Sequence, residues 1–288
     1  MKRALLILTT LLLAASATAD DGKPPSRGLA FFANAGAFRA SDVTANFYSG
    51  REGNANTIYR VLHSNSYGTE IWQRLVSQGA ISPSAVGSYN QLQVVEWAEM
   101  EYRITYQIGI GLRYDYASGF GWLLRADITR LNAIGAFNLS ANNGTGILGS
   151  DPYIRCGLLG KEDRISIDLA LTRSVDLGNN LSLELDLGAS LINTKVKDNL
   201  MEIAGGTWSI LDVWGDRTPD VGVGEYEYMN QGGIGYGVFV SALFGYSLPG
   251  IGAIKAGYTC YHAQTVLEGY TAWGWQHMLG LRIEMNNI

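Results

Sequence analysis

Charged residues recur two positions apart in segments that otherwise alternate apolar and small side chains. Glu184 and Asp186 form one such pair, and Arg113 and Asp115 form another. Successive side chains of a β-strand point to opposite faces, so residues two apart share a face. Charges of both signs on facing strands can neutralise one another in a buried ion network, or they can line a narrow polar channel. The set on such faces is Arg103, Arg113, Asp115, Arg125, Asp127, Asp168, Glu184, Asp186, Lys255, Arg282 and Glu284.

Residues able to act as nucleophiles, bases or metal ligands are few. His262 is followed by Gln264 and Glu268, which resembles the His-x-Ser motif and later Glu of lipid A deacylases, but Gln264 occupies the position of the nucleophilic Ser. His63 and His277 have no matching Ser or Asp, and the His and Cys residues lack the spacing of a zinc site. We therefore expect no catalytic residue, no metal and no cofactor.

A two-residue period organises the chain into strands. The last segment, Trp273 to Met285, carries Trp, His, Leu, Ile and Met at odd positions and mostly Gly, Gln, Arg and Glu at even ones. The same period predicts eight strands, at residues 28–38, 102–116, 122–139, 165–172, 181–191, 234–246, 253–264 and 273–285. Strands with one lipid-facing side must close on themselves, so the pattern predicts an all-β, antiparallel, up-and-down transmembrane β-barrel.

The two faces of such a barrel predict two groups of residues. The interior of an eight-stranded barrel is just wide enough for its own side chains, so the charged set is expected to fill the lumen as an ion network. Aromatic residues at strand ends on the lipid side are expected to form interfacial girdles. These are Tyr102, Tyr114, Tyr116, Trp122, Tyr246, Trp273 and Trp275.

The connections predict the orientation of the barrel. Residues 39–101, 140–163 and 197–233 form long connections, residues 117–119, 178–180 and 248–252 form short ones, and the last connection is moderately long. Outer-membrane barrels have short periplasmic turns and long outer loops, so both termini are expected in the periplasm. Apolar residues at helical spacing predict two short helices, at 57–63 and 69–76, that cap or partly plug the barrel. Residues 200–203 and 207–213 flank Gly205 and Gly206 and predict a hairpin above the membrane.

The start of the chain has the form of a secretory signal peptide. Lys2 and Arg3 precede an apolar run, and Ala17-Thr18-Ala19 fits a cleavage site, so we expect a leader over residues 1–19, a periplasmic lead-in over 20–27 and the barrel over 28–288. The net charge of −5 includes the two leader cations, so the mature chain carries −7. No basic block suits nucleic acid. Cys156, in an expected loop, and Cys260, on a strand, are not expected to pair.

Several stretches resemble a family of outer-membrane β-barrels from Bacteroidota-type bacteria that has no assigned activity. They are residues 193–199 (NTKVKDN), 232–239 (GGIGYGVF) and 267–270 (LEGY), with the loop stretch 54–72. The resemblance implies a barrel in the cell envelope of a Gram-negative bacterium and implies no chemistry.

The sequence therefore predicts a non-enzymatic outer-membrane barrel with a side-chain-filled lumen. We expect it to act through its surface loops, in membrane integrity, surface contact or ligand binding, with outer-membrane lipids and other envelope proteins as partners. Two alternatives stay open. One is a narrow, porin-like transport pore or an accessory barrel of a secretion or uptake assembly. The other is an outer-membrane lipid-modifying enzyme.

Overall fold

The structure is a computed structural model that describes residues 28–54, 56–82, 91–97, 99–141, 153–211, 231–248 and 252–286. The expected signal peptide and lead-in, residues 1–27, lie outside the described residues. The elements are β1 (Gly28–Arg39), α2 (Asp42–Ala45), η1 (Asn46–Ser49), α3 (Ile58–Leu62), α4 (Tyr67–Ser77), β2 (Leu92–Trp97), β3 (Glu101–Tyr102), β4 (Thr105–Asp115), β5 (Phe120–Ala141), β6 (Ile154–Gly178), β7 (Leu181–Ile203), β8 (Gly206–Ser209), β9 (Ile234–Leu248), β10 (Gly252–Leu267) and β11 (Tyr270–Asn286). Among these elements, no helix is long and apolar enough to cross a membrane.

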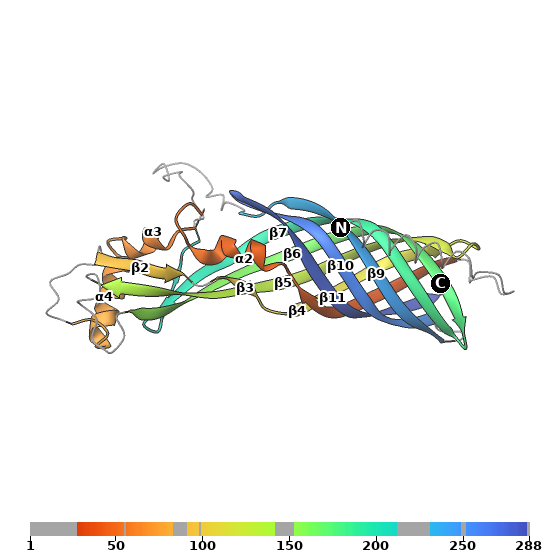
Figure 1. Ribbon diagram of the computed structural model, residues 1–288, viewed down its shortest axis with the longest axis horizontal. Helices are drawn as coiled ribbons and strands as arrows, with labels where there is room; N and C mark the ends of the chain where they lie inside the picture. The colour runs from red at the N-terminus through yellow and green to blue at the C-terminus, as the bar shows by residue number, and fades with distance from the viewer. Residues whose placement is uncertain are drawn as a thin grey trace, which may run out of the picture.

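All strands belong to one antiparallel sheet. Eight of them pair in a closed ring, in the order β1, β4, β5, β6, β7, β9, β10, β11 and back to β1. The sheet as a whole has eleven strands rather than the eight predicted, because β2, β3 and β8 pair with long strands beyond the ring. Figure 1 shows the ring at one end of an elongated molecule and the extension at the other.

Tight hairpin turns connect neighbouring ring strands at both ends of the ring. Asn179 and Asn180, between β6 and β7, have φ of 54° and 66°. Two successive positive φ values suit a two-residue hairpin turn, in which Asn is favoured. The connection between β10 and β11 is also a two-residue turn, because Leu267 pairs with Tyr270 and Gly269 adopts a φ of 65°. The prediction of a moderately long connection there was wrong, since Gly269 permits the left-handed backbone that so short a turn requires.

Three strands of the ring continue well beyond it and form an extension of the same sheet. β5, β6 and β7 extend outward, β2 pairs with the end of β5, and β8 pairs with the end of β7. Residues 140–163 were predicted to be a loop, but β6 already begins at Ile154 and includes Cys156. The hairpin predicted around Gly205 and Gly206 is present, as the outer end of β7 and β8.

Helices pack against this extension of the sheet, on the left of Figure 1. The residue ranges of α3 and α4 nearly match the two helices predicted from sequence, whereas α2 and η1 were not predicted. Fully buried apolar side chains from helices and strands pack together here, including Phe47, Ile58, Leu62, Ile71, Leu75, Leu92, Phe137, Leu139, Met201 and Ile210. We call this part the head: the described residues between 40 and 102, the ends of β5 (130–141), β6 (154–163) and β7 (194–203), and β8.

The outer and inner faces of the ring differ sharply in chemistry. Large apolar side chains are exposed on the outside of every ring strand, for example Ile110, Leu171, Leu191, Phe244 and Leu279. Charged and amide side chains face inward and are buried. A sheet in water would place these groups the other way round. The outer face of the ring is thus an apolar belt that none of the described residues covers.

Candidate functional site

The ring interior next to the short turns holds a dense ion network. Glu184 of β7 accepts hydrogen bonds from Arg113 of β4, Lys255 of β10 and Arg282 of β11. Glu284 lies 2.6 Å from the Lys255 ammonium and 3.2 Å from the Arg113 guanidinium. These side chains come from strands spread around the ring, so their contacts fill its cross-section.

The same network includes two more carboxylates. Arg113 donates to Asp115 at 2.8 Å, and Arg282 donates to Asp186 at 3.1 Å. Three cations therefore face four carboxylates in this lower layer, all within the ring and all but Asp115 almost fully buried. Charges removed from water are tolerated only when each has close partners, which is the arrangement seen here.

A middle layer crosses the ring from one side to the other. Arg125 of β5 donates to the Tyr261 hydroxyl of β10 at 2.6 Å, and these strands lie four places apart in the ring of eight. Arg125 also lies 2.8 Å from Asp127 and donates to Asp168, while Asn34 of β1 donates to Asp127 at 2.7 Å. A direct contact between opposite strands therefore crosses the lumen at this level.

The upper layer lies at the mouth, the end of the ring that faces the head. Arg164 of β6 donates to Glu162 at 2.6 Å and to Gln276 of β11, on the opposite side, at 3.2 Å. The other Glu162 oxygen accepts from the hydroxyls of Tyr48 at 2.5 Å and Tyr102 at 3.0 Å. Burial, together with the adjacent Glu162 carboxylate, raises the pKa of both tyrosines above its ordinary value.

Helix α2 and η1 cover the mouth. Thr44 is buried within hydrogen-bonding distance of Arg164 on β6, and Tyr48 of η1 reaches Glu162 on the same strand. On the other side of the ring, Tyr270 of β11 donates to the backbone carbonyl of Val43 at 2.8 Å. The segment is thus fixed to opposite strands, and it closes the ring interior from the head side.

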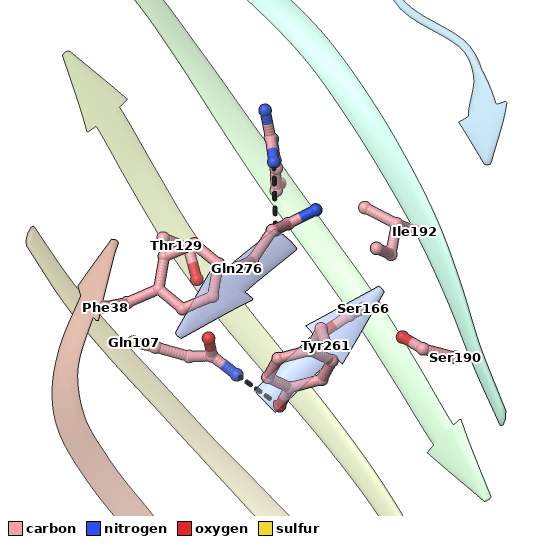
Figure 2. Close-up of a pocket in the computed structure, with 9 residues that line it drawn as sticks. Phe38, Gln107, Thr129, Ser166, Ser190, Ile192, Tyr261 and Gln276 are labelled. Carbon is pink, nitrogen blue, oxygen red and sulfur yellow. Dashed lines mark hydrogen bonds between the residues drawn. The ribbon is translucent and has the colours of Figure 1, made fainter. Parts of the chain in front are cut away.

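A small cavity remains between the middle and upper layers. Its volume is about 20 Å³, and it is lined by Phe38, Gln107, Thr129, Arg164, Ser166, Ser190, Ile192, Tyr261 and Gln276. Figure 2 shows Gln107 and Tyr261 meeting on one side of it, with Ser190 facing it from the other. The Ser190 hydroxyl is buried and has no hydrogen-bond partner among the described residues. A space of this size suits about one water molecule and is too small for a substrate.

The structure brings together all of the predicted lumen residues except Arg103. Arg113, Asp115, Glu184, Asp186, Lys255, Arg282 and Glu284 form the lower layer, and Arg125, Asp127 and Asp168 belong to the middle one. Arg103 is exposed outside the ring, and Tyr102, predicted to face lipid, is buried at the mouth. Both placements were wrong because the register against β5 shifts by one residue between Tyr102, which pairs with Ala133, and Gln107, which pairs with Thr129. The alternation of faces in β4 therefore does not continue through Tyr102.

The other predicted interfacial aromatics lie on the outer face. Tyr114, Tyr116 and Trp122 pack together near the β4–β5 turn, and Tyr246 is exposed at the same end. Trp273 and Trp275 are exposed at the head end. The upper layer, in contrast, includes Glu162 and Arg164, which sequence reasoning missed. Both are separated from Asp168 by an even number of residues, so the same two-residue alternation that placed Asp168 in the lumen could have placed them there too.

Histidine and cysteine side chains are scattered. The ring of His262 packs between those of Trp273 and Trp275, His277 hydrogen-bonds Tyr258 at 2.6 Å, and His63 lies 3.4 Å from the carbonyl oxygen of Leu92. Neither cysteine forms a disulfide. Within the described part of the chain, no three His, Cys, Asp or Glu side chains are grouped as metal ligands would be.

Comparison with known proteins finds similarity to solved structures and none to a family model or curated sequence. No family model matches the chain, and no curated protein sequence matches it. The solved structure of Neisserial surface protein A has a TM-score of 0.44 and 9% sequence identity to it, covering 91% of this chain and 100% of that one. The resemblance to a Bacteroidota-type barrel family therefore stays a prediction.

Proposed function

We propose that this protein spans an outer membrane as a closed eight-stranded β-barrel with a filled lumen and holds the head above the membrane as its functional part. The barrel is the anchor, and the head and adjoining loops provide surface contact or ligand binding without catalysis. In this proposal residues 1–19 direct export, and the chain ends near β1 and β11 lie on the periplasmic side, where the short turns after β4, β6 and β9 are.

The observation that carries the proposal is the height of the apolar belt. On β7 the outward residues from Leu181 to Leu191 are all apolar, and the next ones are Asn193, Lys195 and Lys197. Ten steps of about 3.3 Å, on strands tilted by about 40°, give about 25 Å, which is the apolar height of an outer-membrane barrel. A water-soluble sheet has no reason to end its exposed leucines at this height.

Membrane fractionation tests the proposal. The mature chain should remain in the membrane pellet after an alkaline carbonate wash, require detergent for extraction, and migrate faster on a gel when unheated than when boiled. A folded monomer that stays in solution without detergent would contradict the proposed location.

Conductance measurements distinguish the proposed filled barrel from a transport pore. The contacts between Arg125 and Tyr261 and between Arg164 and Gln276 each cross the ring, so we expect planar bilayers containing the purified protein to show no discrete conductance steps. Openings that disappear on changing Arg113 or Asp186 would support the pore instead.

The enzyme alternative has its own test. Within the described residues, His262 contacts two tryptophans and no Ser, Thr or carboxylate that would make it a base for a nucleophile. We expect no release of fatty acid from lipid A, and the same result for His262→Ala. Deacylation that this variant abolishes would establish an enzyme.

A further inference from the structure

The outer face of the ring changes from apolar to charged within one row of residues. Ile128 of β5 and Ile165 of β6 pair across the strands and are both exposed on the outside. The next outward row toward the head is Arg130, Asp163 and Lys195, which also pair across β5, β6 and β7. The boundary of the apolar belt is therefore marked by charges on three adjacent strands.

Cations exceed carboxylates in this region. We define the basic cluster as Arg103, Arg130, Lys161, Lys195 and Lys197, and the neighbouring carboxylates are Glu101, Asp163 and Asp198. Arg130 and Lys197 share Asp163, at 2.9 and 3.4 Å, and Lys161 lies 3.3 Å from Asp198. Arg103 and Lys195 have no carboxylate partner among the described residues. A local excess of positive charge in a chain of net charge −5 suits an anionic partner.

The cluster lies on one side of the ring. Toward the head end of β9, β10 and β11 the outward residues are Tyr236, His262, Gln264, Trp273 and Trp275. On the neighbouring strand β1, Arg39 is opposite His277 of β11 and forms an ion pair with Asp42 at 3.0 Å. One side of the belt thus ends in aromatic rings, and the side that continues into the head ends in lysine and arginine.

We infer that the basic cluster binds phosphate-bearing lipid headgroups of the leaflet that surrounds the head end of the ring. The inference rests on the proposed membrane location of the belt, because only then are these side chains held at headgroup height. Ammonium and guanidinium groups at this depth can reach the interface while their stems lie along apolar surface. Each donates charge-assisted hydrogen bonds that phosphate oxygens accept.

The test compares two matched pairs of substitutions in the full chain, folded in uncharged detergent micelles. Arg103→Gln with Lys195→Gln removes the two cations that lack a carboxylate partner. Arg51→Gln with Arg155→Gln removes two exposed cations elsewhere on the head, Arg155 being roughly 25 Å along β6 from Asp163 at about 3.3 Å per residue. Phosphatidylglycerol is titrated, and bound lipid is counted by native mass spectrometry. Diacylglycerol with the same acyl chains and inorganic phosphate are the comparison ligands.

We expect the first pair to bind phosphatidylglycerol about 25-fold more weakly than the wild type, at about fivefold per cation, and the second pair to bind as the wild type does. Equal losses in both pairs, no loss in either, or equal binding of diacylglycerol would each overturn the inference. Inorganic phosphate binding as tightly as the lipid would also overturn it, since a membrane-facing site needs the lipid. Gel migration with and without heating is measured first, so failure of the membrane proposal is seen separately from failure of headgroup binding.

Discussion

Replacing Arg282 should lower the stability of the folded ring more than replacing any other side chain of the lower layer. Arg282 is the largest of the fully buried side chains, donates to Glu184 and Asp186, and lies with its guanidinium 4.8 Å from the centre of the Phe32 ring. Arg282→Gln leaves two cations facing four carboxylates in the lower layer. Removing one partner of a buried ion pair typically costs about 3–5 kcal/mol, because the remaining charge can neither pair nor reach water.

Urea unfolding in phosphocholine vesicles, followed by tryptophan fluorescence, measures this cost. Arg130→Gln is the control, because it also removes a guanidinium that pairs with an aspartate but its side chain is 76% exposed. We expect the control to unfold at the wild-type urea concentration. Arg282→Gln combined with Asp186→Asn restores the wild-type excess of one carboxylate in the layer, so this double variant should recover part of the lost stability.

Two results would refute this reasoning. If Arg282→Gln unfolds at the same urea concentration as Arg130→Gln, the lower layer is not a network on which the ring depends. If the double variant is less stable than Arg282→Gln alone, charge balance is not what sets the cost.

Three further predictions concern the head and its junction with the ring. Tyr48→Phe removes a 2.5 Å hydrogen bond to the buried Glu162 and should lower the free energy of unfolding of the head by about 1.5–3 kcal/mol. Amide hydrogen exchange should become faster in the head and stay unchanged in the ring. Gly160→Ala would place a methyl group 2.2 Å from the Tyr48 ring, so we expect a loss of about 1–3 kcal/mol and easier proteolysis of the head. Burial raises the pKa of Cys156 to about 12 and that of Tyr102 above its ordinary value, so the unfolded chain loses these protons first. The free energy of unfolding of the head should therefore be constant up to about pH 8.5 and fall from pH 9 upward. Near-ultraviolet circular dichroism recorded over this pH range measures the change.

Alternation of side chains identified the ring strands because two different environments act on them. Leu187 is exposed on the outside and Asp186 is buried inside, and a strand of the proposed membrane barrel needs both an apolar outer row and a polar inner row. The paired charges of β4, β5, β7 and β11 were predictable for the same reason. Their partners across the ring, such as Tyr261 with Arg125, depend on register and closure, which the sequence of one strand does not contain.

The strands of the head were not predicted because they lack the combination of an apolar outer row and a charged inner row. Along β6, Arg155 and Lys161 point outward into water while Cys156 and Leu158 are buried against the head core, so the apolar face is inverted relative to the ring. Gly160, which in sequence reads as a loop residue, is in a strand and leaves the space that Tyr48 fills. Nothing local indicates that a helix 112 residues earlier in the chain would supply that ring.

Contacts of Glu162 join the ring to the head. Its carboxylate belongs to a ring strand, yet it accepts hydrogen bonds from Tyr48 in η1 and Tyr102 in β3. Because β5, β6 and β7 run without interruption from the belt into the head, the head can tilt only if these strands bend or if the Glu162 contacts break. In the membrane location proposed above, we therefore expect the head to be held at a fixed height and orientation, as the proposed surface contact requires.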